Sequence, residues 1–242
     1  MFIDLHCHIL PQVDDGADSY IEALELISQA VKSGTTILTA TPHFNNNYQG
    51  YRDVNKKIII DKYKKLKNVI SEKKIPATVF LGSELLADSN IPQLHFNNEL
   101  ITINGSRYIL TEFTFDEKIE NVLSYCKQLL SFGYIPLIAH PERYTFFSDS
   151  YHLLYDLIDI GCKFQINKGS PLNKYGEKAQ KLAIRMLEDN FVHVISSDCH
   201  SPSNRNADMS DIYEWLLDRY PLDKVSEWTH DNAKRILLNL NI

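Results

Sequence analysis

The chain has 242 residues, of which 44% are hydrophobic and 23% charged, and its formal net charge is −6. This composition is typical of a globular protein and argues against a long disordered, collagen-like or coiled-coil chain. The acidic balance argues against a protein that holds nucleic acid by bulk electrostatic attraction, although it leaves room for a local anion site.

Short β-branched and apolar runs alternate along the chain with longer amphipathic runs. In the first amphipathic run Leu24, Ile27 and Val31 recur three or four residues apart, which is the period of a helix with one apolar face. Seven strands, each followed by a helix, predict an α/β fold with a parallel sheet, in a single domain over residues 1–242. The expected strands are 2–5, 35–40, 77–82, 108–113, 134–139, 162–167 and 191–196, and the expected helices lie near 19–33, 54–74, 117–132, 149–160, 173–189, 208–219 and 229–240.

The sequence also limits where the protein works. No apolar run reaches the roughly 18 residues that a membrane-spanning helix needs, and MFIDLHCH lacks the basic and apolar regions of a signal peptide. The cysteines form no CxxC pair and no disulfide-like spacing. We therefore expect a reduced, cytoplasmic protein without direct membrane insertion.

Polar side chains follow every expected strand. They recur 27 to 41 residues apart, close to the length of one strand-plus-helix unit. A parallel barrel brings the carboxyl ends of its strands to one rim, where barrel enzymes keep their active sites. We therefore expect residues from the whole chain to converge on one patch. In chain order they are His6 with His8, His43, Glu84, Glu112, His140, Asn167, and Asp198 with His200.

The residue types in this set indicate a metal site. Side chains alternate along a strand, so His6 and His8 share one face while Cys7 points the other way, and Asp198 with His200 repeats the arrangement. Mixed imidazole and carboxylate ligands suit manganese, iron, zinc or magnesium. About nine candidate ligands exceed the needs of one ion, so we expect two or three ions. Such a cluster generates hydroxide near neutral pH, which is the chemistry of phosphoester hydrolysis.

Some polar residues stay outside this prediction. Asn167 is a poor metal ligand, so we expect it to form hydrogen bonds instead. Asp14 and Asp15 precede Gly16, and the residues alone leave open which carboxylate folds over the rim and which makes the turn. The histidines that we expect to be structural are His95, His152, His193 and His230.

Two arginines are candidates for binding phosphate. Arg143 follows His140 in AHPERY, and Arg205 follows His200 in HSPSNR. A guanidinium group matches two phosphate oxygens at once, so we expect both arginines to contact the substrate. The alternative is that each is solvated or pairs with a carboxylate such as Glu142.

With the motifs IDLHCHILPQVDDGA, ATPH, GSE, TEF, IAHPERY and SSDCH, the chain resembles the polymerase and histidinol phosphatase (PHP) superfamily. Within it, the chain most resembles bacterial protein-tyrosine phosphatases encoded with capsule and exopolysaccharide genes, over essentially its whole length. The resemblance implies a distorted (β/α)7 TIM-like barrel and a metal site of two or three divalent ions, typically manganese, with iron, zinc or magnesium as the alternatives. It also implies hydrolysis of phosphotyrosine on a partner tyrosine kinase that controls polysaccharide assembly. The ligands implied by position are His6, His8, Asp15, His43, Glu84, Glu112, His140, Asp198 and His200.

The resemblance also bears on the residues that were left open. It favours Asp15 over Asp14, because the family's ligand directly precedes the glycine. The segment 44–53 and the segment NKGSPLNKYG (167–176) depart from the family pattern, and both would contact the substrate peptide. In the first of them, Phe44, Tyr48 and Tyr51 either flank the substrate's aromatic ring or pack the loop against the protein.

The mechanism that we expect is in-line attack on phosphorus by a metal-bridging hydroxide. Arg143, Arg205 and the metal ions would carry the developing charge on the phosphoryl oxygens. A phenolate with a pKa near 10 is already a fair leaving group, and Asp198 or His43 could help by donating a proton.

Four alternatives remain at this point. Cys199 and Arg205 satisfy C-x5-R, the signature of cysteine-dependent tyrosine phosphatases. However, CHSPSNR has no glycine, and Pro202 lacks the backbone N–H that a phosphate loop needs, so we expect Cys199 to be buried and to face away from the metals. The same scaffold could instead hydrolyse histidinol phosphate or a nucleotide. An amidohydrolase would usually have a modified lysine where Glu112 stands, and a binding module without turnover would ordinarily have lost ligands.

Overall fold

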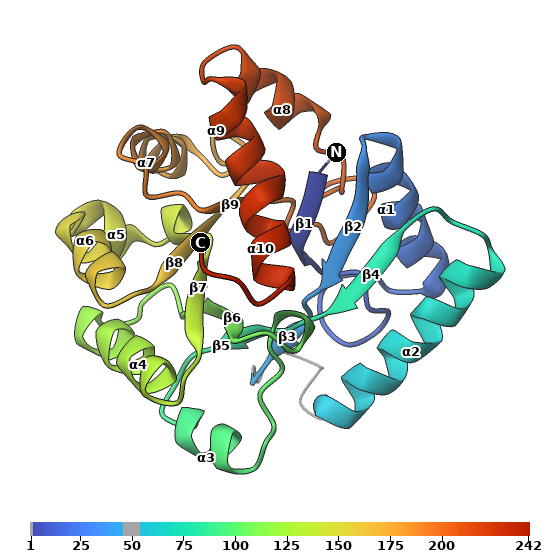
Figure 1. The fold of residues 1–242 in the computed structure, drawn as a ribbon, viewed down its shortest axis with the longest axis horizontal. Helices are drawn as coiled ribbons and strands as arrows, with labels where there is room; N and C mark the ends of the chain where they lie inside the picture. The colour runs from blue at the N-terminus through green and yellow to red at the C-terminus, as the bar shows by residue number, and fades with distance from the viewer. Residues whose placement is uncertain (1, 46–53) are drawn as a thin grey trace.

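The computed structural model describes residues 2–45 and 54–242, and in this part of the chain strands and helices alternate around two parallel sheets (Figure 1). The prediction of an α/β fold with parallel strands is confirmed. One sheet has the order β1 (Phe2–Cys7), β2 (Thr35–Ala40), β4 (Thr78–Leu81). The other has the order β3 (His43–Phe44), β5 (Glu84–Leu86), β6 (Tyr108–Glu112), β7 (Ile135–Ala139), β8 (Lys163–Asn167), β9 (Val194–Ser196).

Backbone contacts connect the two sheets at two places. Strand β3 follows β2 after two residues, β5 follows β4 after two residues, and the backbone bonds Gly82 N–H to Ala40 O and Glu84 N–H to Pro42 O, each 2.9 Å, connect these breaks. At the opposite edges, an isolated parallel bridge pairs Cys7 with Cys199, just beyond β9. The short strands β3 and β5 therefore extend two of the predicted strands toward the side where the strands end.

The helices form the outer layer, and their starts follow ordinary capping chemistry. The Ser19 hydroxyl accepts the backbone N–H of Glu22 at the start of α1 (Tyr20–Lys32), and the side-chain oxygen of Asn55 accepts that of Ile58 at the start of α2 (Lys56–Glu72). The helices are α1 (Tyr20–Lys32), α2 (Lys56–Glu72), α3 (Ile91–Phe96), α4 (Ile119–Ser131), α5 (Thr145–Asp149), α6 (His152–Asp159), α7 (Glu177–Glu188), α8 (Ser210–Leu217), α9 (Leu222–Ser226) and α10 (Asn232–Leu237), with the 3-10 turns η1 (Ile103–Gly105) and η2 (Pro141–Arg143) and the π-helical turn η3 (Glu227–Asp231).

Some predicted boundaries were wrong. The helix expected near 149–160 begins only at α6, because Ser150 (φ −132°, ψ 63°) separates it from α5. The helix expected near 229–240 is part of a longer run that starts with α9 and passes through η3 into α10. Helix α3 was not predicted, since six residues are too few to show a helical period.

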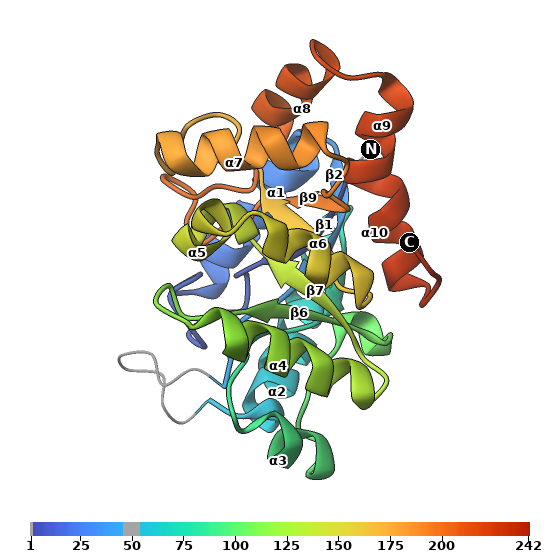
Figure 2. The ribbon, with the colours of Figure 1, turned by 90° about the vertical axis from the view of Figure 1, so that its left-hand side faces the viewer.

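The hydrophobic core has two parts. A large cluster lies between the strands and the outer helices, and a smaller inner cluster joins the starts of several strands to α10. In the inner cluster Ile3 and Leu5 of β1 meet Ile236 of α10, all three essentially inaccessible to solvent. Figure 2 shows α10 and both chain ends on one side of the sheets, with the strands running away from them. Helix α10 therefore covers the amino ends of the strands and leaves the carboxyl ends for a site.

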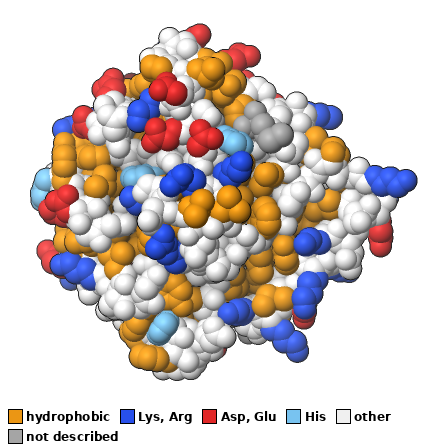
Figure 3. All heavy atoms as spheres, in the orientation of Figure 1, with side chains coloured by type: hydrophobic (Ala, Val, Ile, Leu, Met, Phe, Trp, Pro, Cys, Tyr) orange, Lys and Arg blue, Asp and Glu red, His pale blue; other side chains and the backbone are white. Residues whose placement is uncertain are grey.

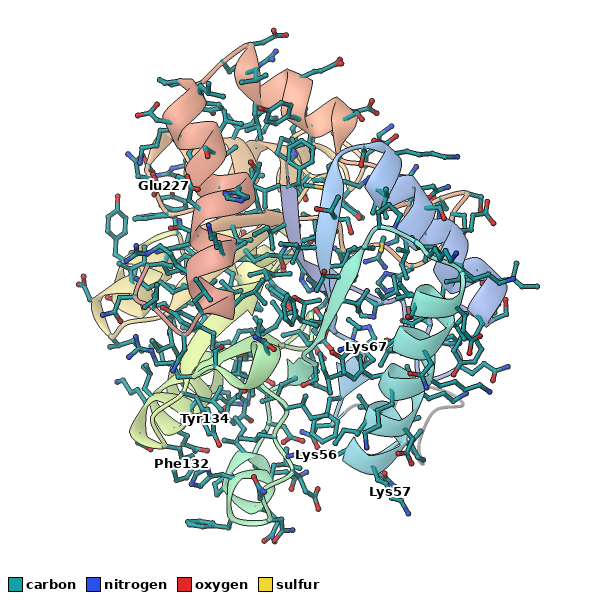
Figure 4. The ribbon with its side chains drawn as sticks, turned by 45° about the vertical axis from the view of Figure 1, so that its right-hand side comes forward. Lys56, Lys57, Lys67, Phe132, Tyr134 and Glu227 are labelled. Carbon is teal, nitrogen blue, oxygen red and sulfur yellow. The ribbon has the colours of Figure 1, made fainter. Side chains whose placement is uncertain are left out.

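Charged side chains are unevenly spread over the surface. On the face shown in Figure 3, lysine and arginine side chains are frequent over α2, while acidic side chains gather over α8 and α9. Figure 4 shows Lys57 projecting away from the first turn of α2, whereas the Lys56 ammonium donates to the carbonyls of Asn98 and Leu100. Within residues 2–45 and 54–242, none of the helices has the length and apolar character that a membrane crossing requires.

Candidate metal centre

The structure brings all nine of the predicted metal ligands together at the carboxyl ends of the strands. They form four overlapping groups, and in each group one nitrogen or oxygen atom per residue lies within 4.8 Å of the others. No further His, Cys, Asp or Glu of residues 2–45 and 54–242 joins these groups. The groups are His8, Asp15, His43 and His200; His6, His140 and Asp198; His6, His8 and Glu84; and His43, Glu84 and Glu112.

An irregularity in β1 aims the first two histidines into the site. Asp4 pairs with Leu38 and Cys7 with Ala40, so two residues of β1 lie opposite one residue of β2. In such a bulge two consecutive side chains can face the same side of a sheet. Leu5 consequently belongs to the inner core, and His6, the next residue, belongs to the metal groups.

The outer nitrogens of these histidines are held by acceptors. His6 Nδ1 lies 2.8 Å from Gln165 Oε1, and His8 Nδ1 lies 2.7 Å from Asp14 Oδ2. Because an amide oxygen and a carboxylate both accept hydrogen bonds, each Nδ1 carries a proton, and each Nε2 is left as the metal-binding atom. Gln165 therefore orients His6, and Asp14 orients His8, each by holding the ring nitrogen opposite the metal-binding one.

The segment between Asp14 and Gly16 resolves the ambiguity of the two aspartates. Asp14 Oδ1 accepts the backbone N–H of Gly16 at 3.0 Å, so Asp14 makes the turn as well as holding His8. Asp15 instead extends over the rim, where its carboxylate lies 3.4 Å from Nε2 of both His43 and His200. Gly16 is required there, because an added Cβ would lie 2.2 Å from the carbonyl oxygen of His8.

The centre of the cluster fits a divalent cation. The Nε2 atoms of His6 and His8 lie 3.1 Å apart, and Glu84 Oε2 lies 3.1 Å and 3.2 Å from them. This Glu84 oxygen is buried and has no hydrogen-bond donor among residues 2–45 and 54–242. Several lone pairs thus converge on a small buried volume, an arrangement that needs positive charge among them.

The electrostatics of the cluster point the same way. Burial lowers the pKa of His8, but the Asp14 carboxylate outweighs burial and raises that pKa to about 10. Burial raises the pKa of Glu84, yet His6, His43 and His140 together hold it well below its usual range. The field that favours a proton on His8 also favours a metal cation in the place of that proton.

Two of the site residues adopt the left-handed backbone conformation. His140 has φ 34° and ψ 52°, and Asp198 has φ 51°. A residue other than glycine in this region costs on the order of 1 kcal/mol, so the surrounding structure must hold it there. His140 directly precedes η2, and its carbonyl accepts the N–H of Arg143 at 3.0 Å, so this turn fixes a candidate ligand and a candidate phosphate-binding residue together.

Both predicted arginines reach the site and share one partner. Arg143 and Arg205 each donate to Oδ2 of Asp198, as does the side-chain amide of Asn167. The predicted hydrogen-bonding role of Asn167 is confirmed. The alternative that each arginine pairs with a carboxylate is therefore seen, but the carboxylate is that of Asp198 and not of Glu142, which is buried and accepts hydrogen bonds from the Ser170 hydroxyl and the backbone of Asn167.

A cavity of about 210 Å³ opens above the cluster. Its walls combine polar groups, namely the candidate metal ligands with Arg143 and Arg205, and the apolar side chains of Leu86, Phe113 and Phe115. A wall with cationic and aromatic parts suits a phosphate group attached to an apolar substituent.

Residues outside the set of candidate ligands bear on the other sequence predictions. Cys199 is buried, belongs to the large core cluster and does not line the cavity, so the structure contradicts a role for it as nucleophile. Phe44 is 5% exposed and packs in the core, whereas Tyr48 and Tyr51 lie outside the described residues. The four histidines expected to be structural, His95, His152, His193 and His230, stay outside the metal groups.

Sequence reasoning missed the residues that support the ligands. Gln165 precedes Asn167 by two positions on β8, and strand alternation could have placed both side chains on the same face. Phe115 and Tyr175 flank Arg143, with its guanidinium carbon 5.5 Å and 4.8 Å from the two ring centres. Such contacts between distant segments have no local signal in the sequence.

Comparisons with known proteins agree with the motifs. Residues 2–238 match the family described as "Capsular polysaccharide synthesis, CpsB/CapC". The chain is 33% identical to the tyrosine-protein phosphatase YwqE of Bacillus subtilis, over 99% of this chain and 93% of that protein. It is 39% identical to the putative tyrosine-protein phosphatase CapC of Staphylococcus aureus, over 84% and 78% of the two chains.

Solved structures extend this agreement to three dimensions. A crystal structure described as that of YwqE from Bacillus subtilis and CpsB from Streptococcus pneumoniae, "unique metal-dependent tyrosine phosphatases", superposes with a TM-score of 0.91 at 31% identity, covering 99% of this chain and 96% of that one. A phosphotriesterase homology protein from Escherichia coli, at a TM-score of 0.62 and 12% identity over 98% of each chain, shares the fold. The resemblance inferred from the motifs is confirmed, and the chain belongs to the CpsB/CapC family of capsular polysaccharide synthesis proteins.

Proposed function

We propose that this protein is a metal-dependent protein-tyrosine phosphatase that removes phosphate from a phosphotyrosine-bearing protein of capsule or exopolysaccharide synthesis. By analogy with the family's role, the substrate is a bacterial tyrosine kinase that controls polysaccharide assembly. The observation that carries this proposal is the complete set of nine converging His, Asp and Glu side chains beside two arginines, in a chain whose relatives are tyrosine phosphatases.

The nine side chains are proposed to hold two or three divalent ions, with manganese as the first candidate. Glu84 belongs to two of the groups, so its carboxylate would help to hold ions in both. When bound, such ions lower the pKa of a water molecule and attract the phosphoryl oxygens. Oxygen and imidazole ligands without a thiolate suit manganese, iron, zinc or magnesium, and the donor set alone does not select among them.

The two arginines are proposed to bind the phosphoryl oxygens. Their guanidinium groups line the cavity, and both are held by Asp198. Because they are already oriented before substrate arrives, little reorganisation accompanies the development of charge on those oxygens. Asp198 balances the two positive charges, and His6 and Arg205 hold its pKa well below its usual range although burial raises it.

Neither Asp198 nor His43 is proposed to protonate the departing phenolate, because both are among the nine proposed metal ligands. One oxygen of Asp198 already accepts from Arg143, Arg205 and Asn167, and the other lies 3.4 Å from Nε2 of His6. His43 lines the cavity, but its Nδ1 lies 2.8 Å from Glu112 Oε1 and its Nε2 lies beside Asp15 in a candidate metal group, so its imidazole is assigned to metal binding. A phenolate needs only modest help from a proton donor, because its pKa is near 10.

We also propose that the two sheets form one distorted seven-stranded barrel in a single domain. The bonds across the β2–β3 and β4–β5 breaks, and the bridge from Cys7 to Cys199 that brings β1 next to the end of β9, support this arrangement. The four cysteines are free and buried, which fits a reducing cytoplasm.

The test is phosphatase activity of the purified protein on a phosphotyrosine peptide and on histidinol phosphate, with Mn²⁺ and with a chelator. We expect manganese-dependent turnover of the peptide, lost by about a thousandfold or more in His6→Ala because an Nε2 ligand disappears. Cys199→Ser is the matched control, since this buried thiol does not line the cavity, and it should stay active.

The outcomes separate the alternatives. Chelator-resistant activity that disappears in Cys199→Ser would overturn the metal mechanism. Strong preference for histidinol phosphate would keep the metal site and reject the tyrosine phosphatase assignment. Absence of turnover on any phosphomonoester by the metal-loaded protein would favour a binding module.

A further inference from the structure

Phe115 is an exposed aromatic residue at the edge of the cavity. It lies three residues after Glu112 in the loop between β6 and α4, is 55% exposed, and lines the cavity. Its neighbour Phe113, by contrast, is buried, and the backbone N–H of Phe113 donates to the Tyr144 hydroxyl at 3.0 Å. The exposed ring of Phe115 therefore contributes little to the core, and its position needs another explanation.

The ring of Phe115 is held in place by two contacts. It lies 5.5 Å from the ring of Tyr144 at an interplanar angle of 49°, and 5.5 Å from the guanidinium carbon of Arg143. Tyr144 is fully buried, so one side of Phe115 rests on the rigid body of the protein. The loop that carries Glu112 thus presents an aromatic surface directly beside a phosphate-binding candidate.

Tyr175 lies on the other side of Arg143. Its ring centre is 4.8 Å from the guanidinium carbon, and it lines two adjoining hollows but not the cavity above the metal ligands. Gly169 makes room for it, because a Cβ there would come within 2.9 Å of Cε2 of Tyr175. Both aromatic residues therefore touch Arg143, and only Phe115 also faces the cavity.

We propose that Phe115 is a specificity-determining residue that selects aryl over alkyl phosphomonoesters by packing against the aromatic ring of the substrate. Tyr175 is a positioning residue that holds Arg143 and does not distinguish the two classes. This inference rests on the proposed function, which places the phosphoryl group between the metal ligands and the two arginines. The group esterified to that phosphate must extend out of the cavity across its edge, where Phe115 lies. Offset or edge-on packing of two aromatic rings is favourable beyond the burial of apolar area, and an alkyl group gains less from it.

The experiment measures binding, so that it does not depend on turnover. Calorimetric titration of the manganese-loaded protein with phenylphosphonate and with methylphosphonate gives one aryl and one alkyl dissociation constant. We expect the wild-type protein to prefer phenylphosphonate, and Phe115→Leu to weaken phenylphosphonate by about tenfold while methylphosphonate changes less than about twofold. Phe115→Trp should restore the preference.

Tyr175→Leu is the matched control, because it removes an aromatic contact of the same arginine from outside the cavity. We expect it to weaken both phosphonates by the same factor and to leave their ratio unchanged. Equal weakening of both ligands in Phe115→Leu, no change in either, or equal affinities in the wild-type protein would each overturn the inference. Failure of the proposed function is distinguishable, since it appears as absent phosphotyrosine turnover in the unaltered enzyme.

Discussion

The two ends of the sheets differ in what they bury. At the amino ends, Ile3, Leu5 and Ile236 pack in an inner apolar cluster closed by α10. At the carboxyl ends, buried positions hold histidines and carboxylates, and Glu84 Oε2 lies close to the Nε2 atoms of His6 and His8 without a hydrogen-bond donor among the described residues. The amino ends bury apolar groups, whose transfer out of water is favourable. The carboxyl ends bury polar and charged groups, whose transfer out of water is costly.

This difference separates stability from function within the same strands. Strand β1 contributes Leu5 to the apolar cluster and the adjacent His6 to the metal groups, with the bulge marking the change. The apolar end stabilises the fold whether or not a metal binds, whereas the polar end reaches its most favourable state only with cations present. Substitutions at the two ends should therefore have separable effects.

The largest effect is expected for Glu84→Gln at the polar end. The substitution keeps the shape but removes the charge of a carboxylate shared by two metal groups. We expect phosphotyrosine turnover at saturating manganese to fall by about a thousandfold, and the increase in melting temperature on adding manganese to shrink. Glu99→Gln, on the exposed surface, is the control. Activity within tenfold of wild type would remove Glu84 from the centre of the site.

The second effect is expected for Ile236→Ala at the apolar end. Ile236 is fully buried against the starts of the strands, so the free energy of unfolding in urea should fall by about 3 kcal/mol. Activity per folded molecule should stay unchanged. Leu238→Ala, at a side chain that is 59% exposed just beyond α10, should change the unfolding free energy by less than about 0.5 kcal/mol. A loss of activity without a loss of stability in Ile236→Ala would contradict the separation of the two ends.

A smaller effect, on metal affinity, is expected for Asp14→Asn, which alters the residue that holds the ligand His8. The amide keeps an oxygen for the N–H of Gly16 but no longer offers His8 Nδ1 a carboxylate. We expect manganese affinity, measured by calorimetric titration, to weaken by about 10- to 100-fold. Asp18→Asn, four residues on and exposed, is the control. Unchanged affinity in Asp14→Asn would mean that His8 is oriented without its help.

The sequence predicts the candidate ligands at the polar end better than it predicts the residues that orient them. Eight of the nine candidate ligands could be predicted because each lies at or just after the end of a strand, and strand period and residue type are local properties. The choice between Asp14 and Asp15 needed the family resemblance, since both carboxylates precede the same glycine.

The contacts that orient the ligands could not be predicted in the same way. The bulge at Leu5 and His6 depends on pairing with β2, and the bond from His6 to Gln165 joins residues 159 positions apart. The packing of Phe115 and Tyr175 on Arg143 likewise forms only in the folded chain. Helix boundaries failed where runs were short, as in α3, because tertiary packing rather than periodicity decides them.

The smallest expected effect concerns the pH dependence of the free energy of unfolding that comes from a histidine outside the metal groups. His193 precedes β9, and its Nδ1 accepts the backbone N–H of Phe164 at 3.2 Å. Burial, helped by the nearby Lys163, lowers the pKa of His193 from 6.5 to about 4. Between these two pH values the unfolded chain binds a proton at this site and the folded protein does not. The neutral imidazole therefore contributes stability that is complete above pH 6.5 and is lost as the pH falls toward 4.

His193→Asn keeps an acceptor for the Phe164 N–H but cannot titrate. With chelator present throughout, we expect the stability advantage of wild type over this variant to shrink by about 2 kcal/mol between pH 7 and pH 4, in urea unfolding curves. Subtracting the two proteins cancels the titration of the metal ligands, because both contain them. Leu238→Ala, at an exposed position that cannot titrate, should give a difference that does not change with pH. A constant difference in His193→Asn as well would mean that the acid sensitivity of the fold lies entirely at the polar end.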